Sequence, residues 1–439
     1  MMKYLIKSFS WLAIVFWSTA GYSQAVPQGN HPKALITVDW NRVVKRVEPL
    51  AYGVNCPACF DPVWGRSPAL LRPLGAISAG GKPLIRLHGW GMVSRGSNEC
   101  WLNQDGTWNT DKIKSALTPL AKMGYTLMID IPSGPGGEQD PLDPAAMARF
   151  ASALVKIVNV DNKFDVKYWE IPNEREHILT AAKMATLVSR ASVAMKQVDP
   201  TILVGGPATE GINVDYIADV VKQSLQDIDF VTAHTYGGDG KQPDSVSFKS
   251  ALKAVDDVRR LRERLTAQSQ EKYLPIFLDE YNIGWDMNPR IHDNRGAVYF
   301  SIIAAGVVDA GGDASAVWDF SPPHDMSIVD RNGNLNVSAN IVSLMNRYCH
   351  GDEVAAMSSN PTLVRIYAVK SASARSVVIS NLSESPSQVR TEFHGLKSRI
   401  VNIYQISHSG YRVEKIHNWR KSHRDGVNLP AMSVTVLVF

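Results

Sequence analysis

The sequence lacks both a long apolar run and an excess of charge of one sign. Beyond its first residues, no stretch approaches the roughly 20 consecutive apolar residues that a membrane-spanning helix needs. The 439 residues carry 46 Lys and Arg against 42 Asp and Glu, a formal net charge of +4. For a chain this close to neutrality, nucleic acid is not an expected partner. We therefore expect neither a nucleic-acid-binding protein nor a membrane-embedded one.

The first residues have the order of a secretory signal peptide. Lys3 and Lys7 precede an apolar run from Phe9 to Trp17, and small and polar residues follow. That run is too short to span a bilayer comfortably, although a retained membrane anchor is the competing interpretation. We expect residues 1–24 to be removed, which leaves a formal charge of +2, and the mature protein to be secreted or periplasmic without membrane insertion.

Cysteine is scarce, with four residues in the whole chain. They are Cys56, Cys59, Cys100 and Cys349, and export would allow at least one disulfide among them, although the spacing does not show which pair forms. The Cys56-Pro-Ala-Cys59 spacing resembles a redox or metal motif. No second Cys or His pair lies at zinc-finger spacing and no thioredoxin-like unit surrounds it, so a structural role is favoured.

Eight short runs of apolar and β-branched residues recur along the chain, and most precede an amphipathic helical pattern. Repeated units of this kind build a parallel sheet, and nearly continuous apolar strands indicate that both faces are covered. The predicted strands are Pro49–Asn55, Pro83–Gly89, Thr126–Pro132, Val166–Asn173, Ile202–Ala208, Phe230–Tyr236, Pro275–Asn282 and Ala314–Ser321. The predicted helices are Lys112–Met123, Ala145–Val158, Ala181–Val198, Val214–Leu225, Phe248–Leu265, Ala297–Ala310 and Ala339–Tyr348.

This pattern predicts an α/β protein with a (β/α)8 TIM barrel over residues 49–349 and an appended antiparallel β-sandwich. No Gly-x-Gly-x-x-Gly turn follows the first strand, which disfavours an open doubly wound sheet. After residue 349 the pattern changes to short alternating strands. Residues 34–48 should pair with them, so that the sandwich combines residues 34–48 with 350–439. Its predicted C-terminal strands are Leu363–Ala368, Ser376–Ser380, Val389–Phe393, Ile400–Ile406 and Ser433–Phe439.

The working groups of such a barrel come from the C-terminal ends of its strands. Among them, Glu174 on the fourth strand and Glu280 on the seventh stand out. Glycosidic bond cleavage needs one acid to protonate the leaving oxygen and a second carboxylate to attack or to activate water. A separation of roughly 5 Å would favour the retaining route. The acid needs a raised pKa, and Trp169 and Trp318 could help by excluding water.

A single Glu at a strand end is more often a solvated residue or a salt-bridge partner. Here an Asn-Glu on the fourth strand, a His-x-Tyr on the sixth, a Glu on the seventh and a Trp on the eighth coincide. These segments resemble the clan A glycoside hydrolases, and within them family 39, the β-xylosidase and α-L-iduronidase family. The resemblance covers nearly the whole mature chain. It is carried by Trp-Glu-Ile-Pro-Asn-Glu at 169–174, Val-Gly-Gly-Pro-Ala at 204–208, His-Thr-Tyr at 234–236 and Asp-Glu-Tyr-Asn at 279–282.

The resemblance implies that Glu174 is the general acid/base, that Glu280 is the nucleophile, and that Asn173 holds the sugar 2-hydroxyl. Arg86 would keep the nucleophile ionised, and Tyr236 could donate a hydrogen bond to the same carboxylate.

Four more residues complete the expected sugar contacts. His234 is expected to bind the sugar or the acid/base, or else to be a structural histidine, and Trp318 to stack on a pyranose. His88 and Trp169 complete the expected binding set. Further subsites could involve Trp90, Trp101 and Trp285.

Two features qualify this assignment. The usual Asn-Glu-Pro of the family is Asn173-Glu174-Arg175 here, with Glu176 and His177 close by. Glu170 and Asp279 are alternative carboxylates. Because neighbouring residues of a strand point to opposite faces, Asp279 should face away from Glu280.

Two other functions remain open. A metal-dependent hydrolase would use His88, Asp130, His234 and Asp319, but no His-x-His pair follows the first strand. We therefore expect no metal and no cofactor. A barrel that binds carbohydrate without cleaving it is the second alternative. For an enzyme, the resemblance favours a β-xyloside, with endo-acting hydrolysis of a bacterial exopolysaccharide as the alternative.

Overall fold

The computed structural model describes residues 34–56, 67–137, 140, 142–269, 272–320, 326–398, 400–419 and 426–439. The predicted signal peptide at residues 1–24 lies outside these ranges. Within them, no helix is both long and apolar enough to cross a membrane. Cys56 is disulfide-bonded, whereas Cys100 and Cys349 are buried free thiols, which excludes those two as its partner.

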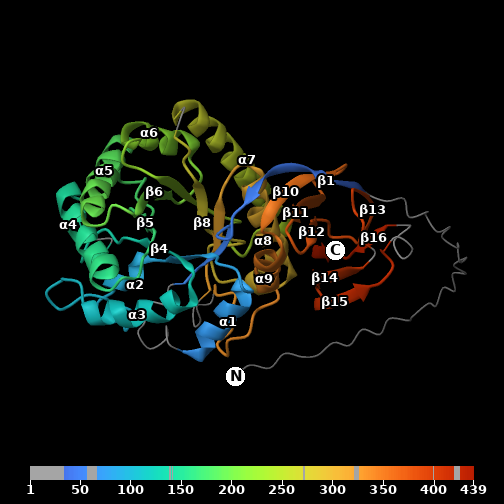
Figure 1. Ribbon diagram of the computed structural model, residues 1–439, viewed down its shortest axis with the longest axis horizontal. Helices are drawn as coiled ribbons and strands as arrows, with labels where there is room; N and C mark the ends of the chain where they lie inside the picture. Colours follow the sequence, from blue (N-terminus) through green and yellow to red (C-terminus); the bar gives the residue numbers. More distant parts are fainter. Residues whose placement is uncertain are drawn as a thin grey trace, which may run out of the picture. The chain divides into compact units, whose positions relative to one another are not determined.

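Eight parallel strands close into a barrel in the order of the sequence (Figure 1). All eight predicted strands are confirmed, with ends that shift by a few residues. The strands are β2 (Tyr52–Asn55), β3 (Leu84–Leu87), β4 (Thr126–Asp130), β5 (Tyr168–Glu170), β6 (Leu203–Thr209), β7 (Phe230–Tyr236), β8 (Ile276–Asn282) and β9 (Ala314–Val317).

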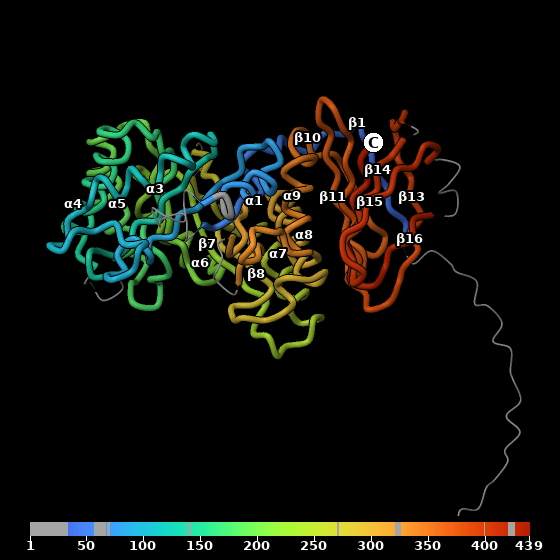
Figure 2. The backbone as a smooth tube through the Cα atoms, turned by 90° about the horizontal axis from the view of Figure 1, so that it is seen from below, coloured from blue at the N-terminus to red at the C-terminus, as the bar shows by residue number. Residues whose placement is uncertain are grey.

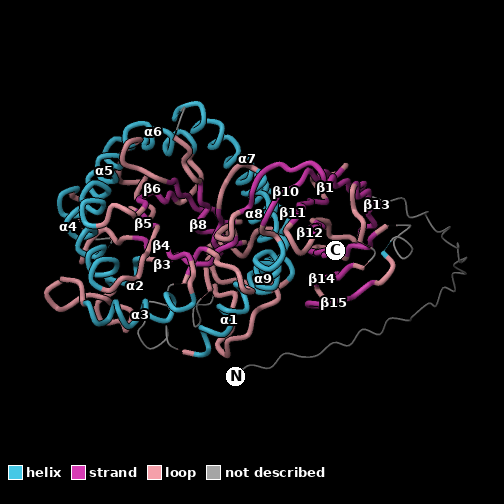
Figure 3. The backbone as a smooth tube through the Cα atoms, viewed as in Figure 1, coloured by secondary structure: helices cyan, strands magenta, loops and turns pink. Residues whose placement is uncertain are grey.

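Helices surround this barrel, as the cyan coils of Figure 3 show. The seven predicted helices are present, whereas α1 was missed because Pro73 and Gly75 interrupt its helical pattern. The helices are α1 (Pro68–Ser78), α2 (Gly89–Val93), α3 (Thr110–Met123), α4 (Pro144–Val155), η4 (Lys156–Asp161), α5 (Ala181–Val198), α6 (Val214–Ser224), α7 (Asp244–Ser269), η5 (Pro289–His292), α8 (Asn294–Asp309) and α9 (Ala339–Tyr348).

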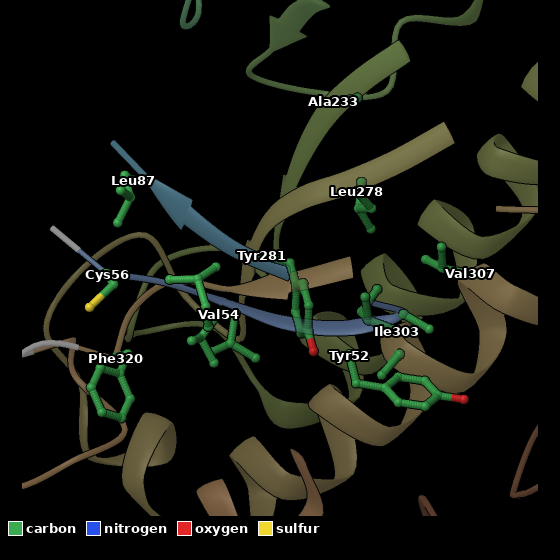
Figure 4. Close-up of a cluster of buried hydrophobic side chains, with 14 of the residues drawn as sticks. Tyr52, Val54, Cys56, Leu87, Ala233, Leu278, Tyr281, Ile303, Val307 and Phe320 are labelled. Atoms are coloured by element: carbon green, nitrogen blue, oxygen red, sulfur yellow. The ribbon is translucent and has the colours of Figure 1, made fainter. Parts of the chain in front are cut away.

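The barrel has an apolar layer on each side of its strands. The outer layer packs strand residues against the helices, and Figure 4 shows part of it, including Val54, Tyr281 and Ile303. The inner layer consists of a small separate cluster near the start of the strands: Leu84, Met128, Phe230, Phe277 and Ala314. Residues two apart on a strand share a face, so the polar residues further along the same strands point into the barrel above this layer.

Gly205 on β6 makes room for the inner apolar layer. A Cβ atom at this position would lie 2.4 Å from the Phe230 ring. That ring packs in turn against Phe277, with centroids 5.2 Å apart. The layer closes the bottom of the barrel and confines any site to the other end.

A nine-stranded sheet forms the second part of the structure (Figure 2). The predicted pairing of residues 34–48 with the C-terminal strands is confirmed, because β1 (Ala34–Val47) lies between β10 (Gly351–Ser358) and β13 (Ser387–His394). The sheet curls around its own apolar core and is antiparallel except for the pairing of β1 with β13. Its other strands are β11 (Val364–Lys370), β12 (Arg375–Asn381), β14 (Val401–Ser407), β15 (Gly410–Ile416), β16 (Val427–Leu429) and β17 (Ser433–Val438); β10, β15 and β16 were not predicted.

The barrel and the sheet belong to one compact unit and share polar contacts. The hydroxyl groups of Ser301 on α8 and Ser380 on β12 are 2.7 Å apart. Lys45 on β1 donates to the carbonyl of Gly312, which follows α8, at 2.9 Å. Directly opposite Lys45 lies Glu353 on β10, which is almost completely buried.

We predict that Glu353 makes the stability of the fold pH-dependent. Burial and the charge of Asp309 raise its pKa to about 8, against the opposing effect of Lys45. Its protonated form therefore stabilises the fold below the ordinary pKa of 4.5, and this contribution is lost as the pH rises through 8. Glu353→Gln should melt at a higher temperature than the wild type at pH 9 and at a similar temperature at pH 5, as followed by circular dichroism. The exposed Glu384→Gln is the control, and an equal effect of Glu353→Gln at both pH values would contradict the prediction.

Candidate active site

A fully buried arginine, Arg86 on β3, occupies the centre of the barrel above the inner apolar layer. Its guanidinium lies 2.7 Å from Glu170 Oε2, 3.1 Å from Asp279 Oδ2 and 3.1 Å from Glu280 Oε2. It also donates to Asn173 Oδ1 at 2.7 Å. Burial alone would lower the pKa of Arg86, but the surrounding carboxylates raise it well above its usual range. The guanidinium therefore keeps its charge and links three strands.

Glu280 is one of two glutamates at the upper end of this arrangement. Arg86 Nη1 donates to its Oε2, and the Tyr236 hydroxyl donates to its Oε1. Only a small part of its side chain is exposed. Two donors, one of them charged, fix the orientation of this carboxylate.

Glu174, the second glutamate, has a backbone conformation that is rare for a residue with a side chain. Its φ is +50°, and its N–H donates to the carbonyl of Ala208 at 2.8 Å; Ala208 itself has a φ of +46°. Backbone strain of this kind persists only where the surrounding structure enforces it, and strained residues are common at functional sites. Here it turns the Glu174 carboxylate toward His234, whose Nδ1 lies 2.7 Å from Oε1.

His234 and Glu174 share a proton. Burial lowers the pKa of His234, but the charge of Glu280 and the hydrogen bond to Glu174 outweigh this effect and raise it. Burial likewise raises the pKa of Glu174, and the hydrogen bond and charge of His234 reverse that shift to a net lowering. In the free protein the shared proton therefore resides mainly on the imidazole.

The two glutamates face each other across the barrel mouth. One carboxylate oxygen of Glu174, one of Glu280 and one ring nitrogen of His234 all lie within 4.8 Å of one another. The side chain of Glu174 is about one-third exposed, whereas that of Glu280 is 8% exposed. A ligand can thus reach both carboxylates from the open end.

Asp279 does not face away from Glu280, and the expectation based on strand alternation is wrong at this point. Between Leu278 and Tyr281, β8 carries one residue more than its neighbours, since two steps on β7 or β9 match three steps on β8. Such a β-bulge turns two consecutive side chains toward one side. Asp279 and Glu280 both contact Arg86 as a result.

Asp279 and Glu170 form a buried carboxyl pair below the two glutamates. Burial and the charge of Glu170 raise the pKa of Asp279 well above its usual range. Burial would also raise the pKa of Glu170, but Arg86 and the hydrogen bond from Asp279 lower it to about 2. These opposite shifts favour a proton on the Asp279 side of the pair. Neither side chain has an exposed surface that a substrate could reach.

Most of the predicted site residues meet at this end of the barrel. His234 and Tyr236 contact the two glutamates and Asn173 accepts from Arg86, as described, and His88 packs edge-on against Trp318, with ring centroids 5.1 Å apart. Asn55 was missed, although it is the polar last residue of the first barrel strand. Its amide donates to the carbonyl of Asp279 at 2.8 Å and its oxygen accepts from Arg86 at 3.0 Å.

Two predicted residues lie elsewhere. Trp169 precedes Glu170 on β5, so its side chain points outward to the helices, where it is fully buried and donates to the carbonyl of Val166 at 3.0 Å. Trp101 is fully buried in the same outer layer. Neither can contact a sugar at the barrel mouth, which corrects the expectation for both.

Two groups of described residues have the spacing of metal ligands, Glu170 with His234 and Asp279, and Glu174 with His234 and Glu280. Each contains a carboxylate within 3.1 Å of the Arg86 guanidinium. A side chain therefore already supplies positive charge where an ion would bind. The set predicted for a metal-dependent hydrolase, with His88, Asp130 and Asp319, does not form such a group among the described residues.

Comparison with known proteins identifies the relationship. The model of the family described as glycosyl hydrolases family 39 matches residues 149–325, a segment that contains both Glu174 and Glu280. The protein is family-39-like. A β-xylosidase from Geobacillus stearothermophilus is 28% identical over 171 residues, which are 36% of this chain and 31% of that protein. The match therefore spans about a third of the length of the curated relative.

Solved structures extend the likeness to the whole fold of the family-39-like protein. An α-L-arabinofuranosidase from Thermotoga maritima superposes with a TM-score of 0.72 at 14% identity, over 92% of this chain and 99% of that one. A monomeric β-xylosidase from Caulobacter crescentus reaches a TM-score of 0.64 at 16% identity, over 92% and 99% of the two chains. At such identities the likeness concerns the fold.

We predict that Arg86→Met strongly destabilises the family-39-like protein. The substitution removes the charge that Glu170, Asp279 and Glu280 share, and leaving buried carboxylates without a partner costs about 3–5 kcal/mol. Denaturant unfolding should show this loss. Arg46→Met, which removes a largely exposed arginine 3.5 Å from Asp352, should change the free energy of unfolding by about 1 kcal/mol or less. Similar values for both variants would show that Arg86 does not organise the barrel interior.

Proposed function

We propose that the protein is a retaining glycoside hydrolase in which Glu174 is the acid/base and Glu280 the nucleophile. The observation that carries the proposal is the short distance between the two carboxylates, whose nearest oxygens lie within 4.8 Å. Retaining enzymes hold their carboxyl groups about 5–5.5 Å apart, whereas inverting enzymes leave roughly 6.5–9.5 Å for a water molecule.

In the first step Glu280 attacks the anomeric carbon while the bond to the leaving oxygen breaks. Arg86 and Tyr236 hold the attacking carboxylate in position through hydrogen bonds to its two oxygens. Glu174 gives its proton to the leaving oxygen, and His234 Nδ1, 2.7 Å away, supplies the proton that Glu174 lacks in the free protein. Asn173 is held by Arg86 beside the acid/base and is suited to bind the sugar 2-hydroxyl.

In the second step Glu174 removes a proton from water, and the resulting hydroxide displaces Glu280 from the sugar. Formation of the glycosyl ester has by then removed the charge of Glu280, which contributes most to raising the pKa of His234. His234, which supplied its proton in the first step, therefore regains one less readily, and Glu174 is left to accept the proton from water. One residue can thus act as acid and then as base, as a double displacement requires.

The favoured substrate is a β-xyloside, in line with the β-xylosidase that matches part of this chain. Endo-acting hydrolysis of a bacterial exopolysaccharide is the alternative. Aryl β-xyloside, α-arabinoside and β-glucuronide, together with xylan and exopolysaccharide, form the panel that separates these possibilities. Proton NMR of the first anomer released by the wild type tests retention.

We predict that Glu280→Gln abolishes turnover of every glycoside that the wild type cleaves, because an amide cannot form the glycosyl ester. Glu174→Gln should lower kcat by about 10²–10⁴-fold, the usual contribution of a general acid. Glu263→Gln on the exposed face of α7 is the control. Undiminished hydrolysis by Glu280→Gln would refute the catalytic assignment, and binding of saccharide without any hydrolysis by the wild type would favour a carbohydrate-binding barrel.

We predict that His234→Asn moves the basic limb of the pH profile of kcat/KM to lower pH. The proton that the pair gives to the leaving group is held by His234, whose pKa is raised, so without the imidazole the acid depends on the carboxyl proton of Glu174 alone. Initial rates on an aryl glycoside across the pH range measure the shift. A basic limb that stays in place or moves to higher pH would show that His234 does not supply the proton.

We also propose that the protein is secreted or periplasmic. The proposal rests on the order of charged, apolar and small residues in positions 1–24. N-terminal sequencing of the mature protein tests it, and a retained N-terminus would contradict it.

A further inference from the structure

The exposed tryptophans of this chain gather at one end of the barrel. Of the eight tryptophans in the described residues, five are buried, Trp318 is half-buried, and only Trp90 and Trp285 are exposed, at 62% and 58%. Trp90 follows β3, Trp285 follows β8 and Trp318 follows β9, so all three lie at the end of the barrel that carries Glu174 and Glu280. Tryptophan is highly buried on average, and apolar surface that gathers in one place marks a binding site.

Trp90 lies near the two residues that flank Glu174 in the chain. Together with Asn173 and Arg175 it lines a hollow next to the acid/base. It stands on the short helix α2, whose first residue, Gly89, donates its N–H to Asp130 Oδ2 at 2.9 Å. A Cβ atom at Gly89 would approach the carbonyl of Asp130 to 2.6 Å, so the helix sits this close only because residue 89 is glycine.

Trp285 stands on two loops that are braced against each other. The backbone N–H of Trp285 donates to the carbonyl of Gly238 in the loop after β7, at 3.1 Å. Arg290, almost fully buried, donates to the carbonyls of Asp239 and Gln242 in the same loop, at 2.8 Å each. Because these hydrogen bonds hold the loop that carries Trp285 in place, little conformational entropy is lost when a ligand covers its indole ring.

The chemistry of this rim favours a saccharide. Indole faces pack well against the apolar C–H face of a pyranose ring. The rim is also continuous with the site, because Trp90 lines the same hollow as Asn173. Trp90 and Trp285 stand on the loops after β3 and β8, which β2 and β9 separate around the barrel, so the two indoles border the mouth at different positions.

We infer that Trp90 and Trp285 are sugar-binding platforms outside the cleavage subsite, and that the substrate is a chain of several sugar units rather than one terminal sugar. The inference rests on the proposed hydrolase function and narrows its substrate class. Units of the chain on either side of the cleaved bond stack on the two indoles, while Trp318 and the carboxylates act on the central unit.

The test compares a short and a long substrate of the same sugar. Aryl β-xyloside and xylohexaose come first, and the sugar is otherwise the one that the wild type cleaves in the panel. Trp90→Ala and Trp285→Ala should each lower kcat/KM for the hexasaccharide about tenfold, mainly through KM, because loss of one stacking contact has roughly this effect. The aryl monoglycoside should change less than twofold, and the Phe variants should retain most of the activity.

Tyr273→Ala is the matched control. Tyr273 is 63% exposed, close to the value for Trp90, but it lies just before β8, at the opposite end of the barrel. It should leave the ratio of the two kcat/KM values unchanged. Calorimetric titration of the hexasaccharide into Glu280→Gln, with and without each tryptophan substitution, measures the same contacts without turnover and should show a tenfold weaker Kd.

The outcomes separate the inference from the proposed function. Suppose that the wild type cleaves the substrates while each tryptophan variant changes kcat/KM for the hexasaccharide and the aryl monoglycoside equally, or changes neither. In that case the inference about Trp90 and Trp285 is wrong and the hydrolase assignment stands. If the wild type cleaves no glycoside and the Glu280→Gln variant binds no hexasaccharide, both fail. A hexasaccharide that binds Glu280→Gln with unchanged Kd after either tryptophan substitution also overturns the inference.

Discussion

The structure depends on one buried charge, the guanidinium of Arg86. A cation without water is stable only when it is paired and fully hydrogen-bonded, and Arg86 meets that condition through Glu170, Asp279, Glu280 and Asn173. The same contacts fix where β5 and β8 place their side chains relative to β3. Below this charge lies an apolar layer and above it an open mouth, so the arrangement separates the part of the barrel that stabilises the fold from the part that can act on a ligand.

Two glutamates of the same chemical type acquire different properties from their surroundings. Glu280 receives hydrogen bonds from Arg86 and Tyr236, which suits an ionised group. Glu174 sits on a left-handed backbone and shares a proton with His234. The charge of Glu280 is the main influence that raises the pKa of His234. The charge of Glu280 therefore affects the proton that His234 shares with Glu174. In the proposed mechanism this coupling lets Glu174 first donate a proton and then accept one.

The loops around the mouth carry side chains that a ligand can reach beyond the two glutamates. The segment after Glu174 continues with Arg175 instead of proline, and Arg175 lines the hollow that Trp90 also borders. The second exposed indole, Trp285, stands on loops braced by Arg290. In the proposed function the barrel supplies the catalytic groups, whereas the loops decide which sugars, and how many of them, can be held. Proteins named as an α-L-arabinofuranosidase and a β-xylosidase share the fold at 14–16% identity.

The sequence by itself determined the barrel, the pairing of residues 34–48 with the C-terminal sheet, and the positions of Glu174 and Glu280. Strands covered on both faces need continuous apolar runs, and parallel strands bring their C-terminal ends together, so periodicity and order were sufficient. Only the tertiary structure decided that Asp279 faces inward and that Trp169 and Trp101 do not reach the site. The bulge in β8 depends on its pairing with β7 and β9, and the burial of an aromatic ring depends on packing between distant segments. Neither leaves a signal in a local pattern, because both arise from contacts between residues far apart in the chain.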